Sequence, residues 1–177
     1  MEARKLERFE KVLDNASYVA AISPADAQEL SKRYNNVHHI TAFHPNEKVA
    51  IKEGKSNFCL YHGNLEVGEN NEAALYLVND VFSKITIPLV IAGRKPSKEL
   101  VSAVAGHKHI ELKANISTEE IDKLIQQAQI NVLPTFQATG IKLKLLAALF
   151  SGKHCVVNSP MVANTGLENL CSVQDSA

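Results

Sequence analysis

Residues 131–157 read NVLPTFQATGIKLKLLAALFSGKHCVV, a succession typical of a strand, a loop, a helix and a second strand. The first strand is predicted over 129–133, and Thr139-Gly140 forms a flexible corner after it. A strongly apolar helix is predicted over 141–150, and the second strand over 155–157. The stretch therefore predicts a βαβ unit, in which the two strands pair in parallel.

Two cations lie at the start of this predicted helix. Lys142 and Lys144 fall in its first turn, where the helix macrodipole by itself favours acids, and residues 123–167 contain no Asp or Glu. Cations in that place indicate that the helix start faces an anion. The alternative is that both lysines are solvated and that their aliphatic stems cover apolar neighbours; the sequence leaves it open.

Strands and helices alternate through the second part of the chain. Strands are predicted over 58–62, 88–92, 109–112, 129–133, 155–157 and 170–173, and helices over 70–82, 97–105, 117–128 and 141–150. Because strands separated by helices pair in parallel, we expect an α/β fold, a Rossmann-like doubly wound parallel sheet. The continuous apolar runs 90–92 and 130–133 predict central strands. Such folds bind ligands at the carboxyl ends of their strands.

The first part of the chain has a different organisation. Its predicted elements are a helix over 2–13, a strand over 18–22, a helix capped by Ser23 and a strand over 37–42. A polar linker follows over 45–57, and the domain boundary is predicted there. Since the opening helix follows no strand, we expect 1–57 to be the remnant of a larger domain and 58–177 to be the second domain.

Composition narrows the classes of function. The chain of 177 residues carries 19 basic and 19 acidic side chains, so it lacks the sustained basic field of a nucleic-acid or membrane-surface binder. Its three cysteines and seven histidines show no metal-ligand spacing, which argues against a metal site and favours free thiols in a reducing compartment. No apolar run has the length of a transmembrane segment.

Known phosphate-binding and catalytic motifs are not found in the predicted loops. Gly63 to Gly68 follows a strand and precedes a helix, but Glu69 stands where a P-loop requires lysine. No G-x-G-x-x-G or G-x-S-x-G sequence follows a strand. The pair Arg94-Lys95 is more suggestive, because two cations end a strand just before a helix capped by Ser97. Phosphate binding and a solvated turn are both compatible with this pair.

Five segments of the second part form a wider pattern. They are LYHGNL at 60–65, EN at 69–70, PLVIAGRKP at 88–96, INVLP at 130–134 and TGIKLKLL at 139–146. Together they resemble the C-terminal domain of retaining glycosyltransferases of the two-Rossmann-domain (GT-B) architecture, the group 1 class. The resemblance covers about 58–173, and residues 17–34 similarly resemble the last strand and helix of that class's N-terminal domain.

The resemblance implies that the second domain binds a nucleotide diphosphate sugar donor without a metal or other cofactor. The diphosphate would lie near Gly63 and at the start of the helix after Thr139-Gly140. Lys142 and Lys144 are the first candidates to contact it, Arg94 and Lys95 the second. The implied donor-binding residues are Gly63, Asn64, Asn70, Arg94, Lys95, Thr139, Gly140, Lys142 and Lys144. Asn64 and Asn70 would bind sugar hydroxyls, although Asn70 is equally compatible with a helix cap. No catalytic residue is assigned.

Two departures from the family pattern leave the activity open. The Glu-x7-Glu motif would fall on Thr139 and Ala147, so both of its carboxylates are absent. The basic pair that binds diphosphate would fall near Asn64 and the Glu69-Asn70 stretch, and it is absent too. Lys142 and Lys144 stand where the pattern has Gly and Pro, from where they would supply replacement cations on the opposite side of the phosphates.

The resemblance thus implies a hexosyl-type glycosyltransferase of polysaccharide biosynthesis. The full-length enzyme would transfer a sugar to a hydroxyl of a saccharide or lipid-linked acceptor, in the cytoplasm or at the periphery of a membrane. We expect this chain to be a fragment that is inactive alone. The alternative is a degenerate, non-catalytic domain that binds a sugar or a protein. A sugar epimerase of the same architecture is less favoured, since no acid and histidine are placed for proton transfer.

Overall fold

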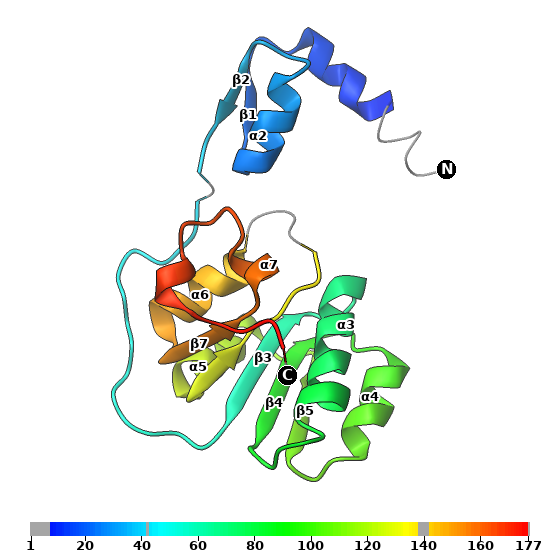
Figure 1. Ribbon diagram of the computed structural model, residues 1–177, viewed down its shortest axis with the longest axis vertical. Coiled ribbons are helices and arrows are strands. Elements are labelled where there is room, and N and C mark those ends of the chain that lie inside the picture. Colours follow the sequence, from blue (N-terminus) through cyan, green and yellow to red (C-terminus); the bar gives the residue numbers. More distant parts are fainter. Residues whose placement is uncertain (1–7, 42, 138–141, 177) are drawn as a thin grey trace. The chain divides into compact units, whose positions relative to one another are not determined.

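The computed structural model describes residues 8–41, 43–137 and 142–176. The chain divides into two compact units, residues 1–44 and 45–177 (Figure 1). The sequence places the boundary in the polar linker 45–57, and in the structure this linker groups with the second unit. Backbone contacts explain this grouping: the Ala50 amide donates to the Phe150 carbonyl, and the Ser56 amide donates to Gln129 Oε1.

The first unit contains a small parallel sheet. Its elements are the 3-10 helix η1 (Lys11–Asn15), β1 (Val19–Ala21), α2 (Pro24–Ser31) and β2 (Val37–His39). The two strands pair in parallel with Val19 opposite Val37. Helix α2 begins where the sequence predicts, because the Ser23 hydroxyl accepts a hydrogen bond from the Asp26 amide and Pro24 occupies the first turn. The helix predicted over 2–13 lies partly in residues 1–7, outside the described residues.

The second unit is built on a six-stranded parallel sheet, which confirms the predicted fold class. Its elements are β3 (Cys59–Asn64), α3 (Gly68–Tyr76), the π-helical turn η2 (Leu77–Val81), β4 (Leu89–Arg94), α4 (Lys98–Ala105), β5 (Ile110–Ala114), α5 (Thr118–Gln127), β6 (Ile130–Val132), α6 (Leu143–Ser151), β7 (His154–Val157), α7 (Ser159–Val162), η3 (Glu168–Leu170) and β8 (Ser172–Val173). The strand order is β5-β4-β3-β6-β7-β8. The two runs predicted as central strands are β4 and β6, and neither lies at an edge.

The sheet carries a hydrophobic core on each face. Alternate residues of β3 belong to different clusters: Tyr61 packs with Leu77 and Leu100, whereas Leu60 packs with Ile125. Helices α3 and α4 lie beside each other, and so do α5 and α6 (Figure 1). A helix pair on each face is what right-handed crossovers from parallel strands require.

Side-chain caps set the starts of two of these helices. The Ser97 hydroxyl accepts from the Leu100 amide at 3.0 Å and starts α4. Ser117 and Glu120 form the predicted capping box at the start of α5, with hydrogen bonds of 3.2 and 3.0 Å. Helix α6 begins later than predicted: Lys142 is its N-cap, with a non-helical ψ of 58°, and Leu143 is its first residue.

The strand order places a topological switch point between β3 and β6. From β3 the chain proceeds outward to β4 and β5, and it then returns to the other side of β3 as β6. The connections that leave the carboxyl ends of these two neighbouring strands run in opposite directions, which is the place where open parallel sheets bind their ligands. In the described part of the chain, no helix has the length and apolar character needed to cross a membrane.

Candidate functional site

Four segments bring polar side chains together at the switch point. They are the end of β3, the first turn of α3, the loop after β6 and the first turn of α6. The residues that carry the contacts are Tyr61, Glu69, Asn70, Thr135, Lys142 and Lys144. The predicted residues Thr139 and Gly140 belong to the same connection but lie outside the described residues.

Asn70 joins three of these segments. Its Nδ2 donates to the Asn64 carbonyl at 3.0 Å, which turns its Oδ1 toward Lys144, whose Nζ donates at 2.8 Å. Its backbone carbonyl accepts from the Tyr61 hydroxyl at 2.9 Å. Asn70 is therefore not a helix cap, since α3 begins at Gly68 without a side-chain cap. An added Cβ at Gly63 would lie 3.3 Å from Asn70 Cγ, so glycine leaves room for this arrangement.

Lys144 is a partly buried cation held by two neighbours. Besides its bond to Asn70, its Nζ lies 5.5 Å from the centroid of the Tyr61 ring, a cation–π contact. Burial lowers the pKa of Lys144 to about 8, the Glu69 carboxylate acts in the opposite direction, and the charge of Lys142 lowers it further. Lys144 is thus mainly charged at neutral pH, in a place that makes the charge costly.

Lys142 lies beside Lys144 at the start of α6. Its Nζ donates to the Gln137 carbonyl at 3.0 Å. Burial lowers the pKa of Lys142 as well, and Glu69 again opposes the shift. The sequence prediction that both lysines occupy the first turn is correct in outline, with Lys142 at the cap and Lys144 as the second helical residue.

Glu69 is the acid of this site. It lies in the first turn of α3, and the hydroxyl of the buried Thr135 donates to its Oε1. Asn158, at the end of β7, fixes Thr135: Asn158 Oδ1 accepts from the Thr135 amide at 3.0 Å, and its Nδ2 donates to the Thr135 carbonyl at 2.7 Å. None of these three residues is among the site residues predicted from the sequence: Glu69 was considered only where a known motif requires a cation, and Thr135 and Asn158 belong to no motif.

His62 is a buried titratable group under the site. Within the described residues its Nε2 has no hydrogen-bond partner. Burial lowers its pKa to about 4, and the charge of Lys144 adds to the effect. The imidazole is therefore neutral at physiological pH.

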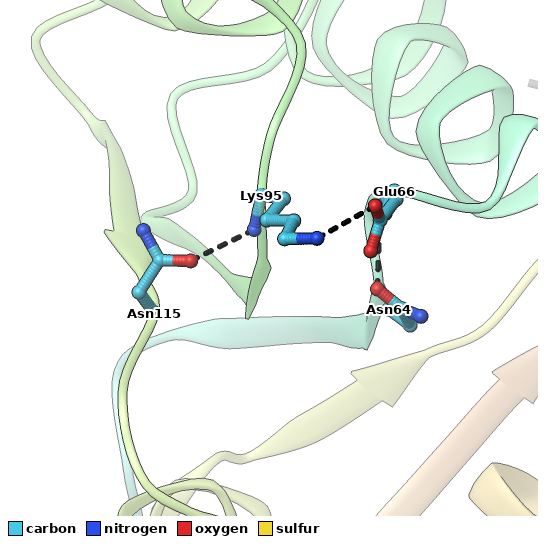
Figure 2. A network of polar contacts seen from close by, with 4 residues as sticks. All are labelled: Asn64, Glu66, Lys95 and Asn115. Atoms are coloured by element: carbon cyan, nitrogen blue, oxygen red, sulfur yellow. Dashed lines mark hydrogen bonds and ion pairs between the residues drawn. The ribbon is translucent and has the colours of Figure 1, made fainter.

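A second polar network lies at the ends of β3, β4 and β5 (Figure 2). The Lys95 amide donates to Asn115 Oδ1 at 2.9 Å, and the Lys95 Nζ pairs with Glu66 at 2.7 Å. The Glu66 amide in turn donates to Asn64 Oδ1 at 3.3 Å. Lys95 has a left-handed φ of 48°, which this network stabilises. Since Glu66 pairs with Lys95 here, Lys142 and Lys144 at the start of α6 are the better candidates to bind an anion.

The structure thus divides the predicted site residues into two groups. Gly63, Asn70, Lys142 and Lys144 meet at the switch point, whereas Asn64, Arg94 and Lys95 end the neighbouring strands β3 and β4. Among the residues that the structure describes, no group of three or more His, Cys, Asp or Glu could hold a metal ion. The cluster around Lys144 combines two ammonium groups, an amide, two hydroxyls and a carboxylate. Such a set can bind an anion that carries hydroxyl groups nearby.

Comparisons with known proteins agree with this architecture. The family model of the glycosyl transferases group 1 matches residues 56–173. The crystal structure of TarM superposes with a TM-score of 0.70 at 12% identity, over 88% of this chain and 32% of that chain. A mutant of S. aureus TarM, in complex with Fondaparinux, alpha-GlcNAc-glycerol and UDP, gives 0.64 at 14% identity, over 82% and 30%.

A third structure extends the comparison. A glycosyltransferase from Rickettsia africae gives a TM-score of 0.62 at 12% identity, over 85% of this chain and 48% of that chain. At these identities the likeness shows the fold. The chain spans between 30% and 48% of the length of these three structures. A search of curated protein sequences finds no match.

Proposed function

The chain belongs to the glycosyl transferases group 1 family, and on that premise we propose that its second unit binds a nucleotide diphosphate sugar through Lys142 and Lys144. The observation that carries this proposal is the placement of Lys144. Its ammonium group is partly buried at the switch point, with a pKa lowered to about 8, and Lys142 lies beside it at the start of α6. Two cations held close together at a helix start are unfavourable; the Glu69 carboxylate offsets part of this cost, and a bound anion would offset more of it.

In the full-length protein, this site would serve the transfer of a hexosyl group to an acceptor hydroxyl. Catalysis of this kind depends on positioning and on stabilisation of the departing diphosphate. A lysine within charge-assisted hydrogen-bonding distance of that leaving group contributes about 1.5 to 3 kcal/mol. The UDP named with the TarM mutant makes uridine diphosphate the first nucleotide to test, with guanosine diphosphate as the second. A saccharide or lipid-linked acceptor and a role in polysaccharide biosynthesis are parts of the same proposal.

The test is calorimetric titration of both nucleoside diphosphates and of their sugars into the protein and its Lys142→Ala and Lys144→Ala variants. We expect each variant to bind at least about tenfold more weakly, which corresponds to the loss of about 1.4 kcal/mol. Lys98→Ala is the matched control, because Lys98 is an exposed lysine in the first turn of α4. The proposal fails if the parent protein binds none of the ligands, or if both site variants bind as tightly as the parent.

One observation supports the alternative of a non-catalytic binding domain. Ala147, where the family pattern has a carboxylate, packs against the hydrophobic cluster around Leu60. Ala147 is partly buried there, and its methyl group replaces a charged group that the family pattern supplies. The two functions are separated by incubating the full-length protein with a nucleotide sugar that it binds: release of the free nucleotide diphosphate indicates transfer or hydrolysis, and tight binding without release indicates a binding domain.

A further inference from the structure

We infer that Glu69 determines the specificity of this site: its carboxylate accepts a hydroxyl group of the ligand and disfavours anions that carry none. The inference rests on the proposed function, since it concerns the same diphosphate site. It assigns to α3 the recognition of hydroxyl groups, and to α6 the recognition of the diphosphate.

The first argument is the position of Glu69 opposite the two lysines. It precedes Asn70, whose side chain accepts the hydrogen bond from Lys144 at 2.8 Å. Its charge acts on Lys142 and Lys144, and in the described part of the chain no other carboxylate affects either of them. An anion that binds the lysines therefore comes close to the carboxylate of Glu69 as well.

The second argument is that Glu69 already accepts a hydroxyl group. The Thr135 hydroxyl donates to its Oε1, and Asn158 holds Thr135 in place through two hydrogen bonds to its backbone. A carboxylate offers about four acceptor positions on its two oxygens. For Oε2 no partner is found within 8–41, 43–137 and 142–176. The acid thus retains capacity for a further hydroxyl donor.

The negative charge of Glu69 and its capacity to accept a further hydroxyl group have opposite effects on ligand binding. Inorganic pyrophosphate has no ribose or sugar hydroxyl group to donate and is highly charged at neutral pH, so its interaction with the carboxylate is mainly the repulsion between their negative charges. A nucleotide sugar meets the same repulsion but donates a hydroxyl group to the carboxylate in a charge-assisted hydrogen bond. Glu69 should therefore select the nucleotide sugar against the bare anion.

The variant Glu69→Gln separates the two effects, because the amide keeps the shape of the side chain and its acceptor oxygen for Thr135 but removes the charge. We expect it to bind pyrophosphate at least about threefold more tightly and the nucleotide sugar about tenfold more weakly than the parent. Glu69→Asp keeps the charge but shortens the side chain by one methylene group. It should bind pyrophosphate like the parent and the nucleotide sugar more weakly.

Calorimetric titration of pyrophosphate, the nucleoside diphosphate and its sugar into each protein gives the readout. Glu72→Gln is the matched control, since it removes an equal charge from an exposed position of the same helix α3. If Glu69→Gln weakens the binding of the nucleoside diphosphate as well as that of the nucleotide sugar, the hydroxyl group that Glu69 accepts belongs to the ribose. If it weakens only the binding of the nucleotide sugar, that hydroxyl group belongs to the transferred sugar. Both results support the inference.

Two results would overturn it. If Glu69→Gln changes the affinity for all three ligands equally, or changes none of the affinities, Glu69 does not discriminate between them. Binding of the nucleotide ligands by the parent would still leave the proposed function intact. If the parent protein binds none of the three ligands, the proposed function fails and the inference fails with it.

Discussion

Replacing Lys144 by methionine should stabilise the folded protein and at the same time weaken diphosphate binding. Methionine keeps an unbranched, apolar stem of similar length against the Tyr61 ring but removes the ammonium group. The two effects have opposite signs because the same charge that an anion requires is disfavoured by burial in the free protein. A residue that is kept at a cost in stability is typical of a functional site.

The magnitude follows from the pKa of Lys144. The difference between 10.5 and about 8 corresponds to about 3 kcal/mol, at about 1.4 kcal/mol per pH unit. Residual contact with solvent reduces this penalty, and the variant leaves Asn70 Oδ1 without its donor, which costs about 1 kcal/mol. We expect a net gain of about 1 to 2 kcal/mol in the free energy of unfolding at pH 7, together with diphosphate binding about tenfold or more weaker.

The pH dependence has a defined sign. A lysine with a lowered folded-state pKa carries its full penalty below about pH 8, and the penalty disappears as the pH rises toward 10.5, where the unfolded state also loses its proton. The parent should therefore gain stability relative to Lys144→Met between pH 8 and pH 10. Urea denaturation of both proteins at pH 7, 8.5 and 9.5 measures this difference in the free energy of unfolding, with Lys98→Met as the control.

Two results would refute this reasoning. One is a Lys144→Met variant that is less stable than the parent by more than the lost hydrogen bond explains. The other is a stability difference between parent and variant that stays constant from pH 7 to pH 9.5. Either result would mean that the Lys144 ammonium is solvated and that its charge is not costly in the folded protein.

Two further predictions concern stability. The pKa of His62 is lowered to about 4, so the parent should lose about 3 kcal/mol of stability through this group as the pH falls from 6.5 through 4, because the unfolded state binds the proton first. His62→Leu should remove this contribution, which makes the pH dependence of stability in urea denaturation less steep than in the parent. Gly93→Ala should cost about 3 kcal/mol or more, since a Cβ would lie 2.0 Å from the Gly63 carbonyl oxygen and 2.8 Å from Leu65 Cγ. Gly68→Ala is its control, with no atom within 4 Å of the added Cβ, and equal stability of the two variants would contradict the clash.

Local features of the fold were predictable because local interactions cause them. Ser23, Ser97 and Ser117 each cap a helix through a hydrogen bond to an amide three residues further on. The parallel sheet followed from the alternation of apolar strands and helices, since crossovers of this length return each strand in the same direction. The start of α6 was placed too early because the apolar pattern continues through Ile141, and pattern alone cannot show that Lys142 has a non-helical backbone.

The contacts of the site were not predictable from local pattern. Lys144 and Asn70 are 74 positions apart in sequence, and Thr135 and Glu69 are 66 positions apart. Only the strand order brings them together, at the switch point between β3 and β6. Lys144 was nevertheless singled out from the sequence, because a cation at a helix start opposes the macrodipole and so gives a local signal. Glu69 gave no such signal, because an acid in a first turn is what the dipole favours.

The first turns of α3 and α6 carry charges opposite to those of the family pattern that the sequence resembles. That pattern would place acids at Thr139 and Ala147 and cations near Asn64 and Glu69, whereas this chain has lysines in the first turn of α6 and a carboxylate in the first turn of α3. A diphosphate and a hydroxyl group can still be bound together, provided that the ligand is placed with its phosphates toward α6. The exchange also explains why Lys144 tolerates its burial: the Glu69 carboxylate raises the pKa of the lysine, so it keeps the cation charged while it selects the ligand.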